Sequence, residues 1–164
     1  MSGTILVAGI GNIFYGDDAF GVEVVAALKP VPENVRVVDF GIRGFDLMMA
    51  LMEGYDLTIF VDAMQCGGVP GTLYIIEPES AEADAIESGH GLDPAKVLAI
   101  ARKLGAPPGR VLVIGCEPAT VAGDTGQIGL SGPVRAAVRP AIEMIHSVIA
   151  EFTGQAPDRK VCAA

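Results

Sequence analysis

Short apolar runs alternate along the chain with segments whose apolar residues recur every three to four positions. Five runs are typical of buried strands, because each is brief, rich in valine, isoleucine and leucine, and bounded by turn-forming residues. They are residues 4–9, 35–40, 57–61, 72–76 and 110–114. Helical periodicity predicts four helices, over residues 18–28, 44–52, 94–104 and 131–152.

The predicted helix ends carry specific sequence features. Asp93 followed by Pro94 predicts a capping carboxylate and a proline at the first helical position. Gly54 follows the second helix, as expected of a residue that ends a helix. Pro140 lies inside the last segment and predicts either a kink or a restart of that helix.

Strands that alternate with helices predict an α/β fold, here a doubly wound three-layer α/β/α domain with a five-stranded, mainly parallel, twisted sheet. Too few residues separate the third and fourth strands for a crossover helix, so the fourth is expected to be the one antiparallel strand. We expect one domain over residues 1–152 and a flexible tail over 153–164. Ligands of such sheets bind beyond the carboxyl ends of the strands, which directs attention to the loops there.

Composition and charge narrow the function. The 164 residues are 51% apolar and carry a net charge of −9, which argues against binding to nucleic acid or an anionic membrane. Three cysteines without a C-x-x-C spacing argue against a disulfide framework or a cysteine zinc site and favour a reducing cytoplasm. Residues 4–10 are too short to span a bilayer, so we expect an untargeted cytoplasmic protein.

The loop after the first strand offers the first candidate chemistry. Residues 9–12 (GIGN) lie between a strand and a helix, as in a dinucleotide fingerprint, and Asp39 could contact a ribose. Phe14 stands where the third glycine belongs, and Asp17 and Asp18 would repel a pyrophosphate. In the alternative interpretation the glycines form only a tight turn and one of the two acids caps the helix.

A second candidate is a set of metal-binding side chains. Asp18, Asp62 and His90 all fall at the predicted carboxyl-end edge of the sheet, and two carboxylates with an imidazole suit a divalent ion such as zinc or nickel. Taken singly, Asp62 could be bonded into its loop and His90 could be solvated, while His146 is expected to be structural or exposed. Because a tightly held catalytic zinc normally has more imidazole ligands, a weakly held or borrowed ion fits better.

The order of the motifs resembles the hydrogenase maturation endopeptidases, which trim the C-terminal extension of the large subunit of nickel–iron hydrogenases. The resemblance runs from the first strand to the last helix. It rests on residues 9–12 (GIGN), 17–22 (DDAFGV), 39–41 (DFG), 61–63 (VDA), His90, 115–118 (GCEP) and 129–131 (GLS). The middle residue Phe40 departs from the turn typical of the family, which is D-G-G-like.

The resemblance implies the doubly wound fold and a metal-contacting trio of Asp18, Asp62 and His90, with both acids as catalytic candidates. The substrate contacts that it implies are Gly11, Asn12, Asp39 and Gly41. It also implies that the nickel belongs to the hydrogenase precursor, whose cysteines hold it, and that the protease contacts this ion to check that metal insertion is complete. Either the metal polarises the scissile carbonyl or activates water, or one of the two acids acts as general base.

On a helix the neighbouring Asp17 would face about 100° away from Asp18, so we expect Asp17 to be a capping residue. The expected partner is the nickel-loaded large-subunit precursor, with no nucleic acid and no membrane insertion, and the protein is expected to act as a monomer. Three alternatives remain at this point. They are a nucleotide-binding Rossmann enzyme, a nickel-dependent docking factor or chaperone that does not cut, and a free-standing metallopeptidase.

Overall fold

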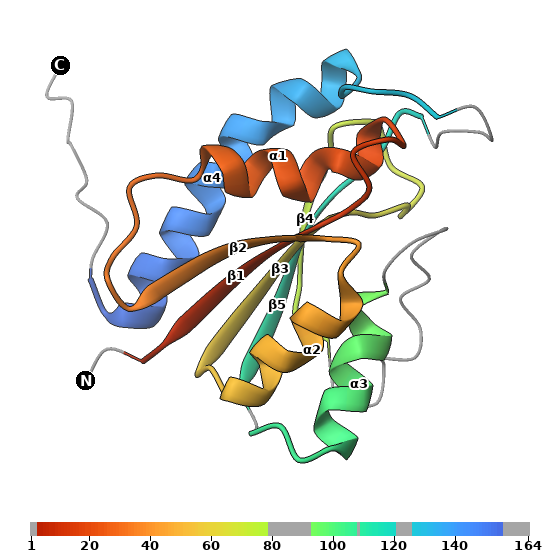
Figure 1. Ribbon diagram of the computed structural model, residues 1–164. Coiled ribbons are helices and arrows are strands. Elements are labelled where there is room, and N and C mark those ends of the chain that lie inside the picture. The colour runs from red at the N-terminus through yellow and green to blue at the C-terminus, as the bar shows by residue number, and fades with distance from the viewer. Residues whose placement is uncertain (1–2, 79–92, 108, 121–125, 156–164) are drawn as a thin grey trace, which may run out of the picture.

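The computed structural model describes residues 3–78, 93–107, 109–120 and 126–155. A five-stranded sheet with strand order β2-β1-β3-β5-β4 forms the centre of the molecule (Figure 1). Its strands are β1 (Ile5–Ile10), β2 (Val35–Gly41), β3 (Leu57–Ala63), β4 (Leu73–Ile76) and β5 (Arg110–Cys116). The pairs β1–β2, β1–β3 and β3–β5 are parallel, while β4 runs antiparallel along β5, as the short connection predicted.

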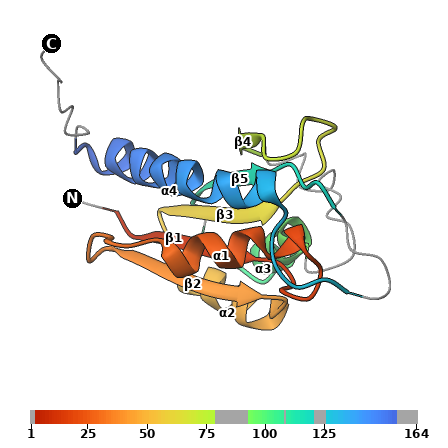
Figure 2. The ribbon, with the colours of Figure 1, turned by 90° about the horizontal axis from the view of Figure 1, so that it is seen from above.

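Helices cover both faces of this sheet. They are α1 (Phe20–Ala27), α2 (Gly44–Glu53), α3 (Pro94–Lys103) and α4 (Gly132–Thr153). Helices α1 and α4 lie side by side over one face, and α2 and α3 lie over the other (Figures 1 and 2). The predicted three-layer α/β/α architecture is therefore confirmed.

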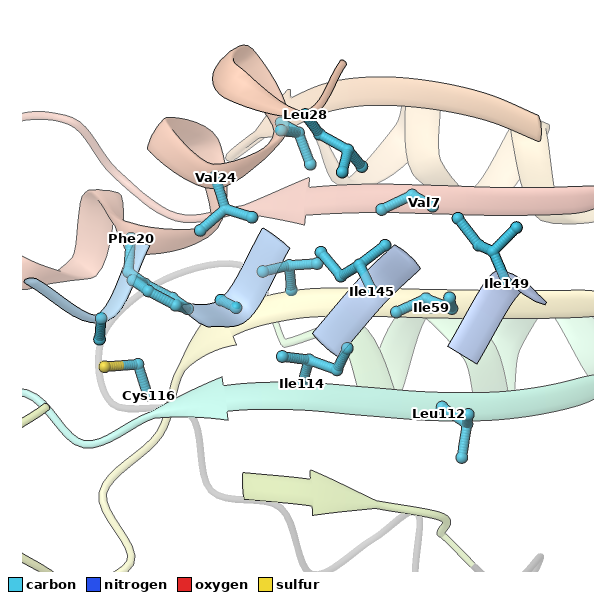
Figure 3. Packing of buried hydrophobic residues seen from close by; sticks show 14 of the residues in the cluster. Val7, Phe20, Val24, Leu28, Ile59, Leu112, Ile114, Cys116, Ile145 and Ile149 are labelled. Atoms are coloured by element: carbon cyan, nitrogen blue, oxygen red, sulfur yellow. The ribbon is translucent and has the colours of Figure 1, made fainter. Parts of the chain in front are cut away.

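The central strand β1 shows why these strands are apolar without alternation. Ile5 and Val7 belong to the core cluster under α1 and α4, whereas Leu6, Ala8 and Ile10 belong to the cluster under α2 and α3. A strand of a parallel sheet that is covered on both faces has no solvent-facing side, so its sequence is continuously apolar. In the first cluster, Figure 3 labels Phe20 and Val24 of α1, Leu28 directly after it, and Ile145 and Ile149 of α4.

Two helices differ from their sequence predictions. The segment predicted as one helix over residues 18–28 begins as a short 3-10 turn, η1 (Asp17–Ala19), and becomes α1 only at Phe20. The last helix runs from Gly132 to Thr153 without a break, so Pro140 does not restart it. Thr153, expected to begin the tail, is the last residue of this helix, and its hydroxyl donates a hydrogen bond to the Ile149 carbonyl at 2.9 Å. Residues 156–164 of the expected tail lie outside the described part of the chain.

The start of α3 agrees with prediction. The Asp93 carboxylate accepts hydrogen bonds from the backbone N–H groups of Ala95 at 3.0 Å and Lys96 at 3.4 Å, and Pro94 is the first helical residue. In the described ranges, none of the helices is both long enough and apolar enough to cross a bilayer.

Candidate active site

Two glycines allow α1 to lie directly against the sheet. A Cβ on Gly21 would lie 1.9 Å from the Val61 carbonyl oxygen and 2.4 Å from that of Ile10, and a Cβ on Gly9 would lie 2.4 Å from Val25 Cγ2. Only residues without a side chain permit such an approach. The 3-10 turn that precedes α1 therefore packs against the carboxyl end of β3.

Asp62 is the penultimate residue of β3 and is 5% exposed. Its Oδ1 accepts a hydrogen bond from the Ala63 backbone N–H at 2.8 Å. The sequence left open whether Asp62 is hydrogen-bonded into its loop or is used in function. The loop hydrogen bond is present, but it occupies only one oxygen of this buried carboxylate. The other oxygen accepts no hydrogen bond from the residues that the structure describes.

Asp18 lies in the 3-10 turn and is half-buried. Its Oδ2 accepts a hydrogen bond from the Asn12 backbone N–H at 2.7 Å. The Asn12 side chain in turn accepts from the Phe14 backbone N–H at 2.9 Å, which closes the loop after β1. Gly11 has a φ of +137°, and a Cβ there would lie 1.7 Å from the Asp18 carbonyl oxygen, so this position requires glycine.

The 3-10 turn that carries Asp18 contacts β3, the strand that carries Asp62. Burial raises the pKa of Asp62 well above its ordinary value, and the negative charges of Asp18 and Asp93 raise it further. Burial also raises the pKa of Asp18, while the hydrogen bond from Asn12 acts in the opposite direction. Asp93 was predicted only as a helix cap, and its nearness to Asp62 is visible only once the fold is known.

The ion pairs present in the described ranges all involve other carboxylates. Neither Asp18 nor Asp62 is paired with a lysine or arginine there. The charge of Asp18 raises the pKa of Asp62, and no described lysine or arginine is paired with either carboxylate. A positive ion bound to the two acids would therefore stabilise their ionised forms.

His90 lies outside the described residues, so the structure does not test its place in the trio. Among the residues that are described, no three side chains of His, Cys, Asp or Glu gather closely enough to hold a metal ion. The part of the site that can be seen is therefore a carboxylate pair.

The loops after β1 and β2 contact each other at Gly11 and Gly41. The Gly11 backbone N–H donates to the Gly41 carbonyl at 3.1 Å, and Gly41 has a φ of +54°. Asp39 is exposed on the edge strand β2, so β1 lies between it and the strand that carries Asp62. Direct substrate contacts by Gly11, Asn12, Asp39 and Gly41 stay predictions. In the structure, the backbone hydrogen bonds of Gly11 and Asn12 shape the loop after β1.

The same contacts bear on the dinucleotide alternative. A pyrophosphate would need free backbone N–H groups in the loop after β1. Here the N–H of Gly11 is bonded to Gly41, and the N–H of Asn12 is bonded to the Asp18 carboxylate. Phe14, at the position of the missing third glycine, is 59% exposed and does not enter the helix–strand contact. The glycines that form that contact are Gly9 and Gly21.

Asp17 is not the helix cap that the sequence suggested. It is fully buried, and its Oδ1 accepts from the Ser131 backbone N–H at 2.7 Å. Its Oδ2 accepts from the N–H groups of Ala119 at 2.8 Å and Thr120 at 3.1 Å and from the Ser131 hydroxyl at 2.8 Å. Burial alone would raise the pKa of Asp17, but these hydrogen bonds outweigh it and lower the pKa. The carboxylate thus fixes the ends of the segment that joins β5 to α4.

Replacing Asp17 by Asn should lower the free energy of unfolding by about 2 kcal/mol at neutral pH, because the new amide NH₂ would face N–H donors. A lowered folded-state pKa stabilises the protein above the unfolded value of about 4, and that contribution is lost as the pH falls through the folded value. The difference between variant and wild type should therefore shrink below about pH 4. Urea unfolding at several pH values measures it; the exposed Asp46→Asn serves as control and should change stability by less than about 0.5 kcal/mol. Equal stability of wild type and Asp17→Asn at pH 7 would contradict this role.

Glu117 is a buried carboxylate that no sequence pattern marked as functional, although it stands in the GCEP segment. It is 6% exposed, directly follows β5, and accepts hydrogen bonds from the N–H groups of Cys66 at 2.8 Å and Gly67 at 3.3 Å and from the Tyr74 hydroxyl at 2.9 Å. Burial alone would raise the pKa of Glu117, but these bonds outweigh it and lower the pKa. Glu117 therefore fixes the loop that follows Asp62.

Comparisons with known proteins give a consistent picture. A family model described as hydrogenase maturation protease matches residues 22–148. The hydrogenase 2 maturation protease of Escherichia coli strain K12 is 33% identical over 95% of this chain and 96% of that protein. The hydrogenase expression/formation protein HupD of Bradyrhizobium diazoefficiens is 35% identical over 90% of this chain and 79% of its own length. Among solved structures, the hydrogenase maturating endopeptidase HybD from E. coli has a TM-score of 0.78 at 32% identity, covering 90% of this chain and 93% of that one.

Proposed function

Because this chain belongs to the hydrogenase maturation protease family, whose members are endopeptidases, we propose that it removes the C-terminal extension of a nickel–iron hydrogenase large-subunit precursor after nickel insertion. We further propose that Asp18, Asp62 and His90 contact the nickel carried by that precursor. The nickel is in this account part of the substrate. The cysteine usage of the sequence makes the cytoplasm our proposed compartment.

The observation that carries the proposal is the unpaired carboxylate pair at the carboxyl end of the sheet. The buried Asp62 has its pKa raised by burial, by Asp18 and by Asp93, and no described cation is paired with Asp62 or Asp18. A divalent ion supplied by a partner would favour the ionised form of both acids. His90 stands only three residues before Asp93 in the sequence, and Asp93 is near enough to Asp62 to raise its pKa.

The donor set suits an ion that is shared only briefly. Carboxylate oxygens are hard ligands, whereas cysteine thiolates are soft, so a thiolate-held nickel would remain with the precursor while the acids occupy its open positions. In this proposal the ion arrives with the substrate and leaves with the processed subunit.

Two roles are open to the acid pair during peptide hydrolysis. In one, the acids hold the nickel, and the ion polarises the scissile carbonyl or activates water. In the other, one carboxylate accepts the proton of the attacking water as general base. The raised pKa of Asp62 favours it for the second role, because a more basic carboxylate accepts that proton more readily.

The test uses the purified precursor with and without nickel, and the mass of the large subunit after incubation is the readout. We expect the mass to fall by that of the extension only when nickel is present. An unchanged mass with a stable complex would support the non-cutting chaperone instead. Cleavage of unrelated peptides on addition of zinc would support a free-standing metallopeptidase.

A further inference from the structure

The loops around the acid pair expose large apolar side chains. Of the large apolar residues that the structure describes, the most exposed are Ile128 at 83%, Val69 at 76% and Phe45 at 70%. Phe14, in the β1 loop that also holds Asp18 through Asn12, is more than half exposed. Large exposed apolar side chains that share one face of a protein are typical of an interaction site.

These four residues come from four different connections at the carboxyl-end edge of the sheet. Phe14 lies between β1 and η1, Phe45 is the second residue of α2 after β2, and Val69 lies between β3 and β4. Ile128 precedes α4. The segment before it pairs with the β1 loop, since the Gln127 N–H donates to the Phe14 carbonyl at 2.7 Å. We call Phe14, Phe45, Val69 and Ile128 the rim patch.

Polar side chains hold at least three of these connections in place. The Asn12 side chain accepts from the Phe14 N–H, and Glu117 accepts from the N–H groups of Cys66 and Gly67 in the loop that carries Val69. On the connection that precedes α4, the Asp17 carboxylate accepts hydrogen bonds from both the N–H and the hydroxyl of Ser131, three residues after Ile128. The apolar side chains are thus presented on fixed loops, which reduces the entropy that a partner must overcome on binding.

The acids near the rim patch indicate which kind of partner fits it. The rim patch lies at the same carboxyl-end edge of the sheet as the acids Asp18 and Asp62, so an occupant that fits brings a metal ion with open coordination positions, framed by apolar surface. A nickel ion held in a folded subunit has this character, and four separate loops suit a broad folded surface better than a single extended peptide. We propose that the rim patch is the docking surface for the folded body of the nickel-loaded precursor. This proposal rests on the proposed function and adds to it where the substrate is held.

The experiment compares two double variants. Val69→Ser with Ile128→Ser removes apolar surface from the rim patch, and Ile100→Ser with Leu104→Ser removes similar exposed surface from α3 and the residue after it. We expect the first double variant to raise KM for nickel-loaded precursor by about tenfold or more with kcat within about twofold of wild type. The control should leave both constants unchanged. A KM of the rim variant equal to that of the control would overturn the proposal.

Complex formation is measured in parallel, so that docking is scored even where no cleavage occurs. A wild-type protein that binds the precursor through the rim patch but never shortens it would contradict the proposed function and leave docking supported. Sedimentation of the protein alone measures its oligomeric state. A wild-type dimer that the rim variant converts to a monomer would assign the patch to a second copy of this chain and overturn the proposal.

Discussion

Replacing Asp62 by Asn should abolish cleavage of the nickel-loaded precursor and at the same time stabilise the fold. We expect the processing rate to fall at least about a hundredfold, because a neutral amide is neither a nickel-binding anion nor a base. We also expect a higher denaturant midpoint at neutral pH, because burial and the charges of Asp18 and Asp93 disfavour the ionised carboxylate. A residue kept at a cost in stability is a mark of function.

The stability gain has a defined pH dependence. Above its raised folded-state pKa, Asp62 is ionised and destabilises the wild type relative to Asp62→Asn by the full amount. As the pH falls below that value the difference shrinks, and it disappears only below the unfolded pKa of about 4, where the carboxyl is neutral in both states. Denaturant unfolding across this range measures it. The matched control is Glu143→Gln, an exposed acid on α4, which should change neither the midpoint nor the processing rate. Normal processing by Asp62→Asn would refute the assignment.

Replacing Gly21 by Ala should lower the free energy of unfolding by about 3 kcal/mol or more. The added methyl would lie 1.9 Å from the Val61 carbonyl oxygen and 2.4 Å from that of Ile10, and neither backbone atom can move without displacing a central strand. The helix must then shift away from the sheet. That shift separates Asp18 from Asp62, so the fraction of the variant that still folds should also process the precursor poorly.

Gly132→Ala provides the control for this substitution. Gly132 is the first residue of α4, and nothing lies within 4 Å of a Cβ added there. Alanine is a better helix former, so this variant should be as stable as the wild type or more stable by up to about 1 kcal/mol. Urea unfolding of both variants tests the contrast, and equal midpoints for the two would show that the close approach of α1 is not tightly constrained.

Much of the fold could be predicted because its cause is local. The continuous apolar run of β1 follows from burial on both faces, and Asp93 with Pro94 marks the start of α3. The antiparallel β4 follows from the short connection to β3. The 3-10 turn before α1 could not be predicted, because it depends on the close approach of Gly21 to the Val61 carbonyl, which is distant in the sequence.

The candidate site was predictable in part for the same reason. Asp18 and Asp62 could be proposed because strand ends of a parallel sheet meet at one edge. The roles of Asp17 and Glu117 could not, since each binds backbone N–H groups of a loop far away in the chain, 50 or more residues from its own position. A buried acid that supports a loop and one that contacts substrate look alike in a sequence.

In the proposed complex, Asp18 and Asp62 reach the nickel of the precursor. X-ray absorption at the nickel edge detects this contact in a complex of this protein with nickel-loaded precursor made uncleavable at its scissile bond. We expect additional oxygen or nitrogen neighbours around the thiolate-bound nickel when the wild-type protein binds, and fewer of them with Asp18→Asn or Asp62→Asn. A nickel spectrum that stays the same on complex formation would show that neither carboxylate binds the ion.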